Sequence, residues 1–195
     1  MAALDNGGFA AVWSDSGNDG SGYGIFGRRF DASGTAIDAN DFQVNSAISG
    51  TQADAGITGL PDGGFIVTWT SASASGDTSS YGVAGQRFDA SGNKIGTEFL
   101  VNTTTANQQK YPYVTALDDG DFVVAWGSDL QAGDNSELGV YAQRFASPIP
   151  FGTTTTTEHA VSTVTGSTTG EAPFGSNVSF GVGGKTLTLD LSAHH

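Results

Sequence analysis

The sequence predicts an all-β protein with a β-propeller-like fold. It is expected to contain three antiparallel, four-stranded repeats, each a blade-like unit, and a C-terminal β-hairpin extension. Two recurring segments carry this prediction. The tryptophans that close the first segment are 56 and 57 residues apart, at Trp13, Trp69 and Trp126. The arginines of the second are 58 and 57 residues apart, at Arg29, Arg87 and Arg144. Such spacing is typical of tandem units that pack on one another.

Each repeat is expected to begin with a β-hairpin. In the third copy, two β-rich runs at residues 111–117 and 122–126 flank an Asp/Gly turn at 118–121, a pattern typical of antiparallel strands. Large side chains alternate with smaller ones along the second run. One face therefore carries Phe122, Val124 and Trp126. Because the opposite face is small but not strongly polar, we expect both faces to be covered.

A polar loop of about ten residues separates this hairpin from a third strand in every copy, at residues 14–22, 71–80 and 128–137. An Asp-Ala-Ser-Gly turn follows the third strand in the first two copies, where Asp bonds its own backbone and Gly permits positive φ. A fourth strand is predicted at residues 42–45 and 99–102. Four antiparallel strands in about 57 residues is the size of one propeller blade.

Three blades are too few to close a ring on their own. Closure would need tail strands, further blades of a parent protein, or a second chain, so a homo-oligomer that completes the propeller is one expected arrangement. The first copy lacks most of its opening strand, and the N-terminus shows no signal-peptide pattern. We therefore favour a fragment of a longer protein, with export through a signal elsewhere as the alternative.

The predicted domains are a repeat region at 1–147, with copies at about 1–50, 51–108 and 109–147, and a tail at 148–195. Pro148 and Pro150 mark the boundary, because proline cannot continue a central strand. The tail begins as a Thr-rich linker. Apolar residues then alternate with small or polar ones between 178 and 191, which predicts a hairpin. This hairpin either supplies the strand that the third copy lacks or is half of a small separate β-domain.

The composition excludes several kinds of partner. The chain of 195 residues has 20 acidic and 7 basic side chains, a net charge of −13, and no cysteine. Nucleic acid is not expected, because phosphate binding needs clustered Lys and Arg. Disulfides and thiolate metal sites are excluded. No apolar stretch is long enough to span a bilayer, so membrane insertion is not expected. The charge suits a divalent cation or a neutral or cationic partner.

The repeat resembles the tandem repeats of very large bacterial secreted and surface proteins, many of which carry RTX-type calcium modules. The resemblance rests on Gly-Gly-Phe-Ile-Val-Thr-Trp at 63–69, Tyr-Gly-Val-Ala-Gly-Gln-Arg-Phe-Asp-Ala-Ser-Gly at 81–92 and Glu-Phe-Leu-Val-Asn at 98–102. It implies an extracellular, propeller-like module associated with adhesion or matrix interaction, and it implies no reaction. A tandem array of the RTX nonapeptide Gly-Gly-x-Gly-x-Asp is absent, and residues 153–195 match no pattern of this family.

The first and third polar loops are candidate calcium sites. Calcium takes oxygen ligands from carboxylates, amides and carbonyls, and glycine permits the tight turns that bring carbonyls inward. The candidate ligands are Asp15, Asn18 and Asp19 in the first loop, and Asp129, Asp134, Asn135 and Glu137 in the third. Because the spacing lacks the register of an EF-hand, ordinary solvated turns are the alternative interpretation.

The recurring tyrosines and arginines are candidate ligand-binding residues. Tyrosines near the loops suit carbohydrate contact, and the planar guanidinium suits carboxylate or sulfate groups. The candidates are Tyr23, Tyr81, Tyr141, Arg29, Arg87 and Arg144. The favoured interpretation of the arginines is structural, with each one stacked on a tryptophan or paired with a hairpin-turn aspartate, namely Asp5, Asp62 or Asp118. The tryptophans are expected in the core.

The favoured function is a non-catalytic, calcium-binding module, secreted or on the bacterial cell surface, for adhesion or for carbohydrate or surface binding. One alternative is a glycan-active hydrolase or lyase on a propeller scaffold, because glycoside hydrolysis needs only two suitably spaced carboxylates. Another is a self-assembling surface-layer or filament unit. Catalysis is less favoured, because no nucleophile-elbow motif occurs and the acidic residues recur in turns.

Overall fold

The computed structural model describes residues 1–72, 74, 76–77, 80–129 and 139–146, and the backbone of two further strands. The chain divides into two compact units, Met1–His159 and Ala160–His195. The second unit contains the antiparallel hairpin of β12 (Asn177–Val182) and β13 (Lys185–Asp190). The hairpin expected in the tail is therefore confirmed. The described residues include no helix long and apolar enough to cross a membrane.

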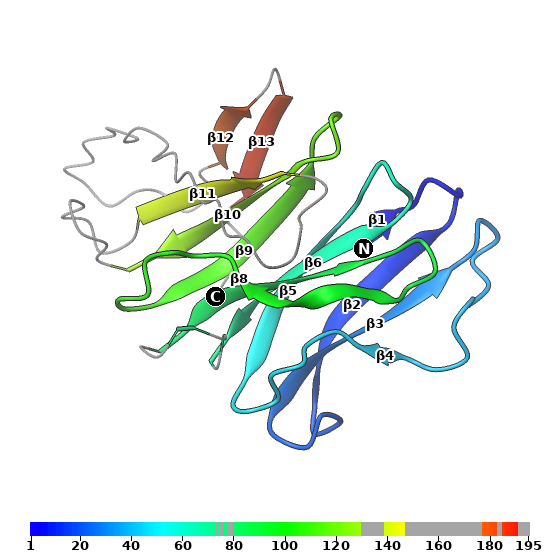
Figure 1. Cartoon of the computed structure of the whole chain (residues 1–195), viewed down its shortest axis with the longest axis horizontal. Coiled ribbons are helices and arrows are strands. Elements are labelled where there is room, and N and C mark those ends of the chain that lie inside the picture. The colour runs from blue at the N-terminus through cyan, green and yellow to red at the C-terminus, as the bar shows by residue number, and fades with distance from the viewer. Residues whose placement is uncertain are drawn as a thin grey trace. The chain divides into compact units, whose positions relative to one another are not determined.

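The described residues of the first unit form three antiparallel sheets in a row (Figure 1). The first sheet is formed by β1 (Ala2–Ala3), β2 (Phe9–Ser16), β3 (Tyr23–Phe30) and β4 (Phe42–Gln43). The second is formed by β5 (Gln52–Gly59), β6 (Phe65–Ser71), β7 (Gly82–Phe88) and β8 (Lys94–Leu100). The third has β9 (Gln109–Ala116), β10 (Phe122–Ser128) and β11 (Gly139–Phe145) in its described part.

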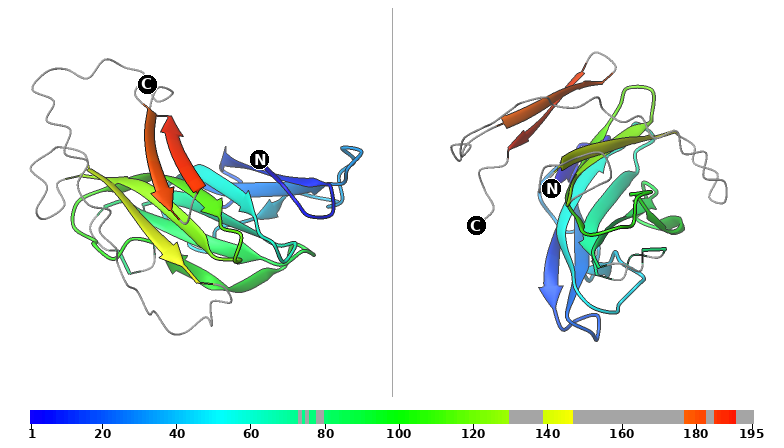
Figure 2. Two further views of the ribbon diagram at one scale, coloured as in Figure 1. Left: turned by 90° about the horizontal axis from the view of Figure 1, so that it is seen from above. Right: turned by 90° about the vertical axis from the view of Figure 1, so that its left-hand side faces the viewer.

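The all-β prediction is therefore confirmed, and the sheets fit blade-like units. Strand order follows chain order in the first two sheets, as in an up-and-down blade. The described residues do not form a closed ring (Figure 2).

The core lies between successive sheets. Phe65, Val67 and Trp69 of β6 are fully buried against the first sheet. Phe122, Val124 and Trp126 of β10 pack in the same way against the second sheet. Alternation along each strand places these residues on one face. All seven residues of β6 are buried, so the expectation that both faces of this strand are covered is confirmed. The core position predicted for Trp69 and Trp126 is confirmed, whereas Trp13 is half-buried.

Each fourth strand covers a glycine of the third strand. Gly27 faces Phe42, and Gly85 faces Phe99. A Cβ atom on Gly85 would lie 2.7 Å from Cζ of Phe99, and one on Gly27 would lie 2.9 Å from Cζ of Phe42. Real Cβ atoms do not approach other atoms so closely. The recurring glycine thus permits the aromatic ring of the fourth strand to approach the third strand closely.

A buried pair of amides joins each sheet to the next, and we call it the Asn–Gln clasp. Asn102 Oδ1 accepts a hydrogen bond from the Val83 amide at 2.7 Å, and its Nδ2 donates to Gln109 Oε1 at 3.2 Å. Asn45 and Gln52 repeat this arrangement in the first sheet. All four side chains are buried, and the partners are seven residues apart in both copies. The clasp therefore closes the link between the fourth strand of one sheet and the first strand of the next.

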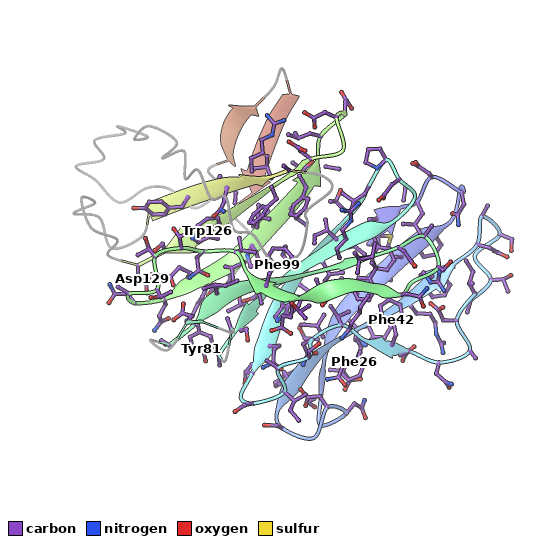
Figure 3. All side chains as sticks on the ribbon, viewed as in Figure 1. Phe26, Phe42, Tyr81, Phe99, Trp126 and Asp129 are labelled. Atoms are coloured by element: carbon purple, nitrogen blue, oxygen red, sulfur yellow. The ribbon has the colours of Figure 1, made fainter. Side chains whose placement is uncertain are left out.

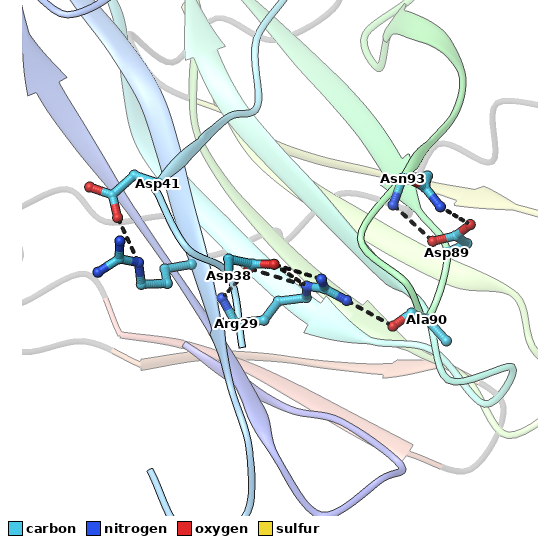
Figure 4. A network of polar contacts seen from close by, with 7 residues as sticks. Arg29, Asp38, Asp41, Asp89, Ala90 and Asn93 are labelled. Carbon is cyan, nitrogen blue, oxygen red and sulfur yellow. Dashed lines mark hydrogen bonds and ion pairs between the residues drawn. The ribbon is translucent and has the colours of Figure 1, made fainter. Parts of the chain in front are cut away.

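An arginine ties the first sheet to the second at the rim (Figure 4). Arg29 Nη2 lies 2.6 Å from Asp38 Oδ1, and Arg29 Nη1 donates to the Ala90 carbonyl at 3.0 Å. Burial raises the pKa of the Asp38 carboxyl, but hydrogen bonds and the charge of Arg29 outweigh it and hold the pKa below its ordinary value of 3.8. The carboxylate is therefore stabilised in the folded state.

Replacing Asn102 with alanine should destabilise the first unit. The Val83 amide and Gln109 Oε1 would lose a buried partner, and we expect the free energy of unfolding to fall by about 2 kcal/mol. Urea denaturation measures this change as a lower midpoint. The matched control is Asn93→Ala, which removes an exposed hydrogen bond to Asp89 and should change the free energy by less than about 0.5 kcal/mol. Equal effects of the two substitutions would contradict a structural role for the clasp.

The Arg29–Asp38 pair should make stability depend on pH in the acid range. Because the folded-state pKa is lowered, its contribution is present above pH 3.8 and is lost as the pH falls below that value through the lowered pKa. We expect Asp38→Asn to be less stable than wild type at neutral pH, with the difference shrinking on acidification. Thermal melts across this pH range test it, with Asp5→Asn on an exposed turn as the control. A difference that is independent of pH would contradict the prediction.

Candidate functional site

The first strands of the second and third sheets are β5 and β9, and we call them the inner strands. Each holds one residue in the left-handed conformation. Asp54 in β5 has φ of 56°, and Tyr111 in β9 has φ of 58°. These non-glycine residues occupy equivalent places in the repeat. Each lies in a β-bulge, since the register shifts between Ala53 and Gly56 in one sheet and opposite residues 125–127 in the other. A bulge redirects a side chain, and left-handed non-glycine residues concentrate at functional sites.

The two bulges lie beside each other because β5 packs against β9. The Tyr111 amide donates a hydrogen bond to Thr70 Oγ1 at 3.1 Å. Thr70 pairs across the sheet with Ala53, which precedes Asp54. The Asp54 side chain is exposed, and Tyr111 retains 41% of its accessible surface. A carboxylate and an aromatic ring are thus presented on neighbouring inner strands.

A basic residue and a second tyrosine adjoin these bulges. Lys110 Nζ lies 4.2 Å from the centre of the Tyr81 ring, a cation–π contact. The Gln109 amide donates to the Tyr81 carbonyl at 2.8 Å, which holds the start of β9 against the residue that precedes β7. Figure 3 shows Tyr81 on the same side of the view as Asp129. We call Asp54, Tyr81, Lys110 and Tyr111 the inner-strand site.

Of the predicted ligand-binding tyrosines, Tyr81 alone belongs to the inner-strand site. Tyr23 is exposed at the start of β3. Tyr141 in β11 is half-buried and packs against the core between the second and third sheets. The structure does not bring these three rings together, so a common ligand would not contact them at one place.

The predicted arginines all have carboxylate partners. Arg87 pairs with Asp62, so that expected ion pair is confirmed. Arg144 pairs with Asp119 and Asp121, at 2.6 and 2.7 Å, whereas the sequence suggested Asp118. In the first sheet the partner of Arg29 is Asp38, where the sequence suggested Asp5. These contacts agree with the structural interpretation, and ligand binding by the arginines stays a prediction.

The candidate calcium ligands are only partly described. Asp15 is half-buried, Asn18 is exposed, and Asp129 is half-buried. Asp134, Asn135 and Glu137 lie outside the described residues. Within the described part of the chain, no group of three or more His, Asp or Glu side chains could hold a metal ion.

Asp19 differs from the other loop acids because it is buried, with 9% of its surface exposed. Its Oδ1 accepts a hydrogen bond from the Ser21 amide, while its Oδ2 is buried and has no hydrogen-bond partner among the described residues. It lies under Gly24, whose added Cβ would be 2.8 Å from Oδ2. Asp77 lies under Gly82 in the same way. In both copies the aspartate comes five residues before this glycine of the third strand. This spacing is visible in the sequence and could have indicated the buried aspartates.

Sequence reasoning missed Asp54, Lys110 and the Asn–Gln clasp. The clasp had a readable signal, since an asparagine precedes a glutamine by seven residues in two copies. Asp54 had none, because the equivalent residue of the third copy is Tyr111 and the two side chains share no chemistry. A pattern search for recurring residue types passes over such a position.

Comparison with known proteins finds similar solved structures only. Neither a protein-family model nor a curated protein matches the chain. Similar solved structures include an endo-arabinase from Bacteroides thetaiotaomicron VPI-5482, with 15% identity, 72% of this chain and 53% of that chain covered, and a TM-score of 0.48. An endo-1,4-β-xylanase from the same organism has 11% identity, coverage of 73% and 52%, and a TM-score of 0.46. A thermostable family-43 glycoside hydrolase has 8% identity, coverage of 74% and 53%, and a TM-score of 0.43.

The chain spans about half the length of these structures. All three carry the names of glycan-degrading enzymes, which contradicts the favoured interpretation as a non-catalytic, calcium-binding adhesion or surface-binding module. The glycan-active alternative accords better with these similar structures, whose likeness to this chain is one of fold.

Proposed function

We propose that this chain is part of a glycan-active enzyme on a propeller-like scaffold, with carbohydrate bound at the inner-strand site. The observation that carries the proposal is the pair of adjacent bulges, which present the Asp54 carboxylate and the Tyr111 ring in the left-handed conformation on neighbouring strands. Strained backbone costs about 1–3 kcal/mol per residue, and a role in ligand contact accounts for its presence in both copies.

The chemistry of the site suits a sugar. An exposed tyrosine ring offers an apolar platform and a hydroxyl, which match the two kinds of surface on a pyranose or furanose ring. Lys110 adds a hydrogen-bond donor beside the Tyr81 ring. Asp54 would supply one of the two carboxylates that glycoside hydrolysis needs, as proton donor or acceptor at the scissile bond.

A calcium ion at the first loop is a further part of the proposal. It is supported by Asp19, whose buried Oδ2 has no hydrogen-bond partner among the described residues. A buried carboxylate is costly without compensation, and a cation held with Asp15 and Asn18 would provide it. The resemblance to RTX-type surface proteins, an extracellular location and a homo-oligomer that closes the ring stay predictions.

Hydrolysis is tested by the release of reducing sugar from a panel that includes arabinan and xylan, the polysaccharides suggested by the names of the similar structures. We expect Asp54→Asn to lower the rate by about a hundredfold or more, the usual effect of losing a general acid or base. Asparagine tolerates the left-handed conformation, so the variant should keep its fold.

The matched control is Asp5→Asn, which removes a carboxylate from an exposed turn of the first sheet. Tyr111→Asn should raise KM more than it lowers kcat, because it removes the stacking ring and keeps the backbone. The proposal fails if no polysaccharide is cleaved, or if Asp54→Asn cleaves as fast as the control.

The calcium site is tested by thermal melts with chelator and with millimolar calcium. A ligand at a hundredfold excess over its Kd adds about 2.7 kcal/mol to stability, which raises the Tm by about 5–10 °C in a protein of this size, at about 2–4 °C per kcal/mol. We expect Asp19→Asn to abolish the rise and Asp5→Asn to retain it. An unchanged Tm in the wild type would contradict the calcium site and would leave the loop as an ordinary solvated turn.

A further inference from the structure

Lys110 differs from the arginines in the group that holds its charge. Every arginine in the chain pairs with an aspartate, namely Asp41, Asp38, Asp62 or Asp119. Lys110 Nζ lies over the Tyr81 ring, 4.2 Å from its centre, and none of the ion pairs among the described residues includes it. In a chain with a net charge of −13, this ammonium group therefore faces an aromatic ring where the arginines face carboxylates.

The lysine is specific to the third sheet. The corresponding residue of the second sheet is Ala53, which pairs across the strands with Thr70. Lys110 pairs instead with Gly127, which has no side chain beside the lysine stem. Because the second sheet forms the same pairing with an alanine, the fold does not require a cation at this place. A contact with a ligand would account for it.

The backbone on both sides of Lys110 is fixed. Gln109, whose side chain belongs to the Asn–Gln clasp, donates its amide to the Tyr81 carbonyl at 2.8 Å. The Tyr111 amide donates to Thr70 Oγ1 at 3.1 Å. The lysine itself is half-buried. An ammonium group carries three N–H donors, and a ring on one side does not take all of them, so Nζ keeps a donor for an acceptor that approaches from solvent.

We propose that the inner-strand site binds a mostly neutral glycan that carries a uronic acid, and that Lys110 binds the carboxylate of this sugar. This recognition rests on the proposed function, since a sugar must first lie beside Asp54 and Tyr111. A hydrogen bond from an ammonium group to a carboxylate is roughly twice as strong as one between neutral groups. The Tyr111 ring, with 41% of its surface exposed, offers an apolar face on which a neighbouring neutral sugar can lie.

The charge of the chain favours a single acidic sugar over a polyanion. Lys110 is the only cation of the inner-strand site, and the exposed Asp54 carboxylate adds a negative charge to it. The net charge of −13 repels a chain of carboxylates as it approaches. Lys110 can neutralise one carboxylate, but each further one would meet an acidic surface. A glycan in which uronic acids occur singly among neutral sugars satisfies both conditions, and a polyuronate does not.

Calorimetric titration of the full chain with two forms of one ligand tests the proposal. The first form is a xylo-oligosaccharide with a single glucuronate branch, and the second is the same compound after reduction of its carboxylate to an alcohol. We expect the acid to bind about tenfold more tightly than the reduced form, as for a hydrogen bond to a charged group. Trigalacturonate, in which every sugar is acidic, should gain less over its own reduced form.

Lys110→Met should abolish the preference for the acid and leave the affinity for the reduced form unchanged, because methionine keeps an unbranched apolar stem beside the Tyr81 ring. Lys110→Arg should retain the preference, since arginine keeps the charge and the contact with the ring. The matched control is Lys94→Met, which removes a lysine that donates to Ser46 Oγ and should also retain the preference. Far-UV circular dichroism checks that each variant keeps its fold.

Equal binding of the acid and the reduced form, or a preference that survives Lys110→Met, overturns the proposal. If arabinan or xylan is cleaved in a reaction that depends on Asp54 while the acid is not preferred, the proposed function stands and only the role of Lys110 falls. A preference that depends on Lys110, without cleavage of any polysaccharide, supports the recognition and contradicts the enzyme. A wild type that binds neither form contradicts both.

Discussion

The stacking of a Phe–Trp face on the aliphatic face of the preceding sheet is the contact on which the first unit depends. Trp69 and Phe65 have no exposed surface there, and burial of each such side chain contributes about 1.5–3 kcal/mol or more. A single four-stranded sheet would leave this face in water. The hydrogen bond from Arg29 to the Ala90 carbonyl occurs beside this contact, and Phe99, which lies over Gly85, packs in the corresponding contact between the second and third sheets. They fix the orientation of sheets that apolar burial has already brought together.

The repetition made much of this arrangement predictable. The spacing of Trp13, Trp69 and Trp126 placed a central strand in each sheet, and strict alternation named the buried face, because neighbouring strand residues point to opposite sides. The same repetition concealed the inner-strand site. The left-handed backbone at Asp54 and Tyr111 depends on how β5 meets β9, which are 57 residues apart in the sequence. Neither Asp nor Tyr as a residue type predicts this conformation. Local residue types predict strands better than they predict where two strands distort each other.

The choice of ion-pair partners shows the same limit. Arg87 takes the turn aspartate Asp62, as its sequence position suggests, but Arg29 takes Asp38, which lies in the segment between the third and fourth strands of the first sheet. The competing carboxylate exists in that copy alone, since the position corresponding to Asp38 is Gly96 in the second. Copies of one repeat therefore keep their packing while their charged side chains diverge. Function is more readily gained at such diverged positions than at the shared ones.

The Asn–Gln clasp also determines how the unit would respond to tension. The linker of six residues between Asn102 and Gln109 is closed by hydrogen bonds at its two ends, so a pulling force on the chain reaches the clasp before it reaches the linker backbone. The clasp bonds lie in a buried site that water does not enter freely, which slows their exchange for bonds to solvent. Successive sheets would then separate in discrete steps, one clasp at a time. The six-residue linker would extend only after its clasp has opened.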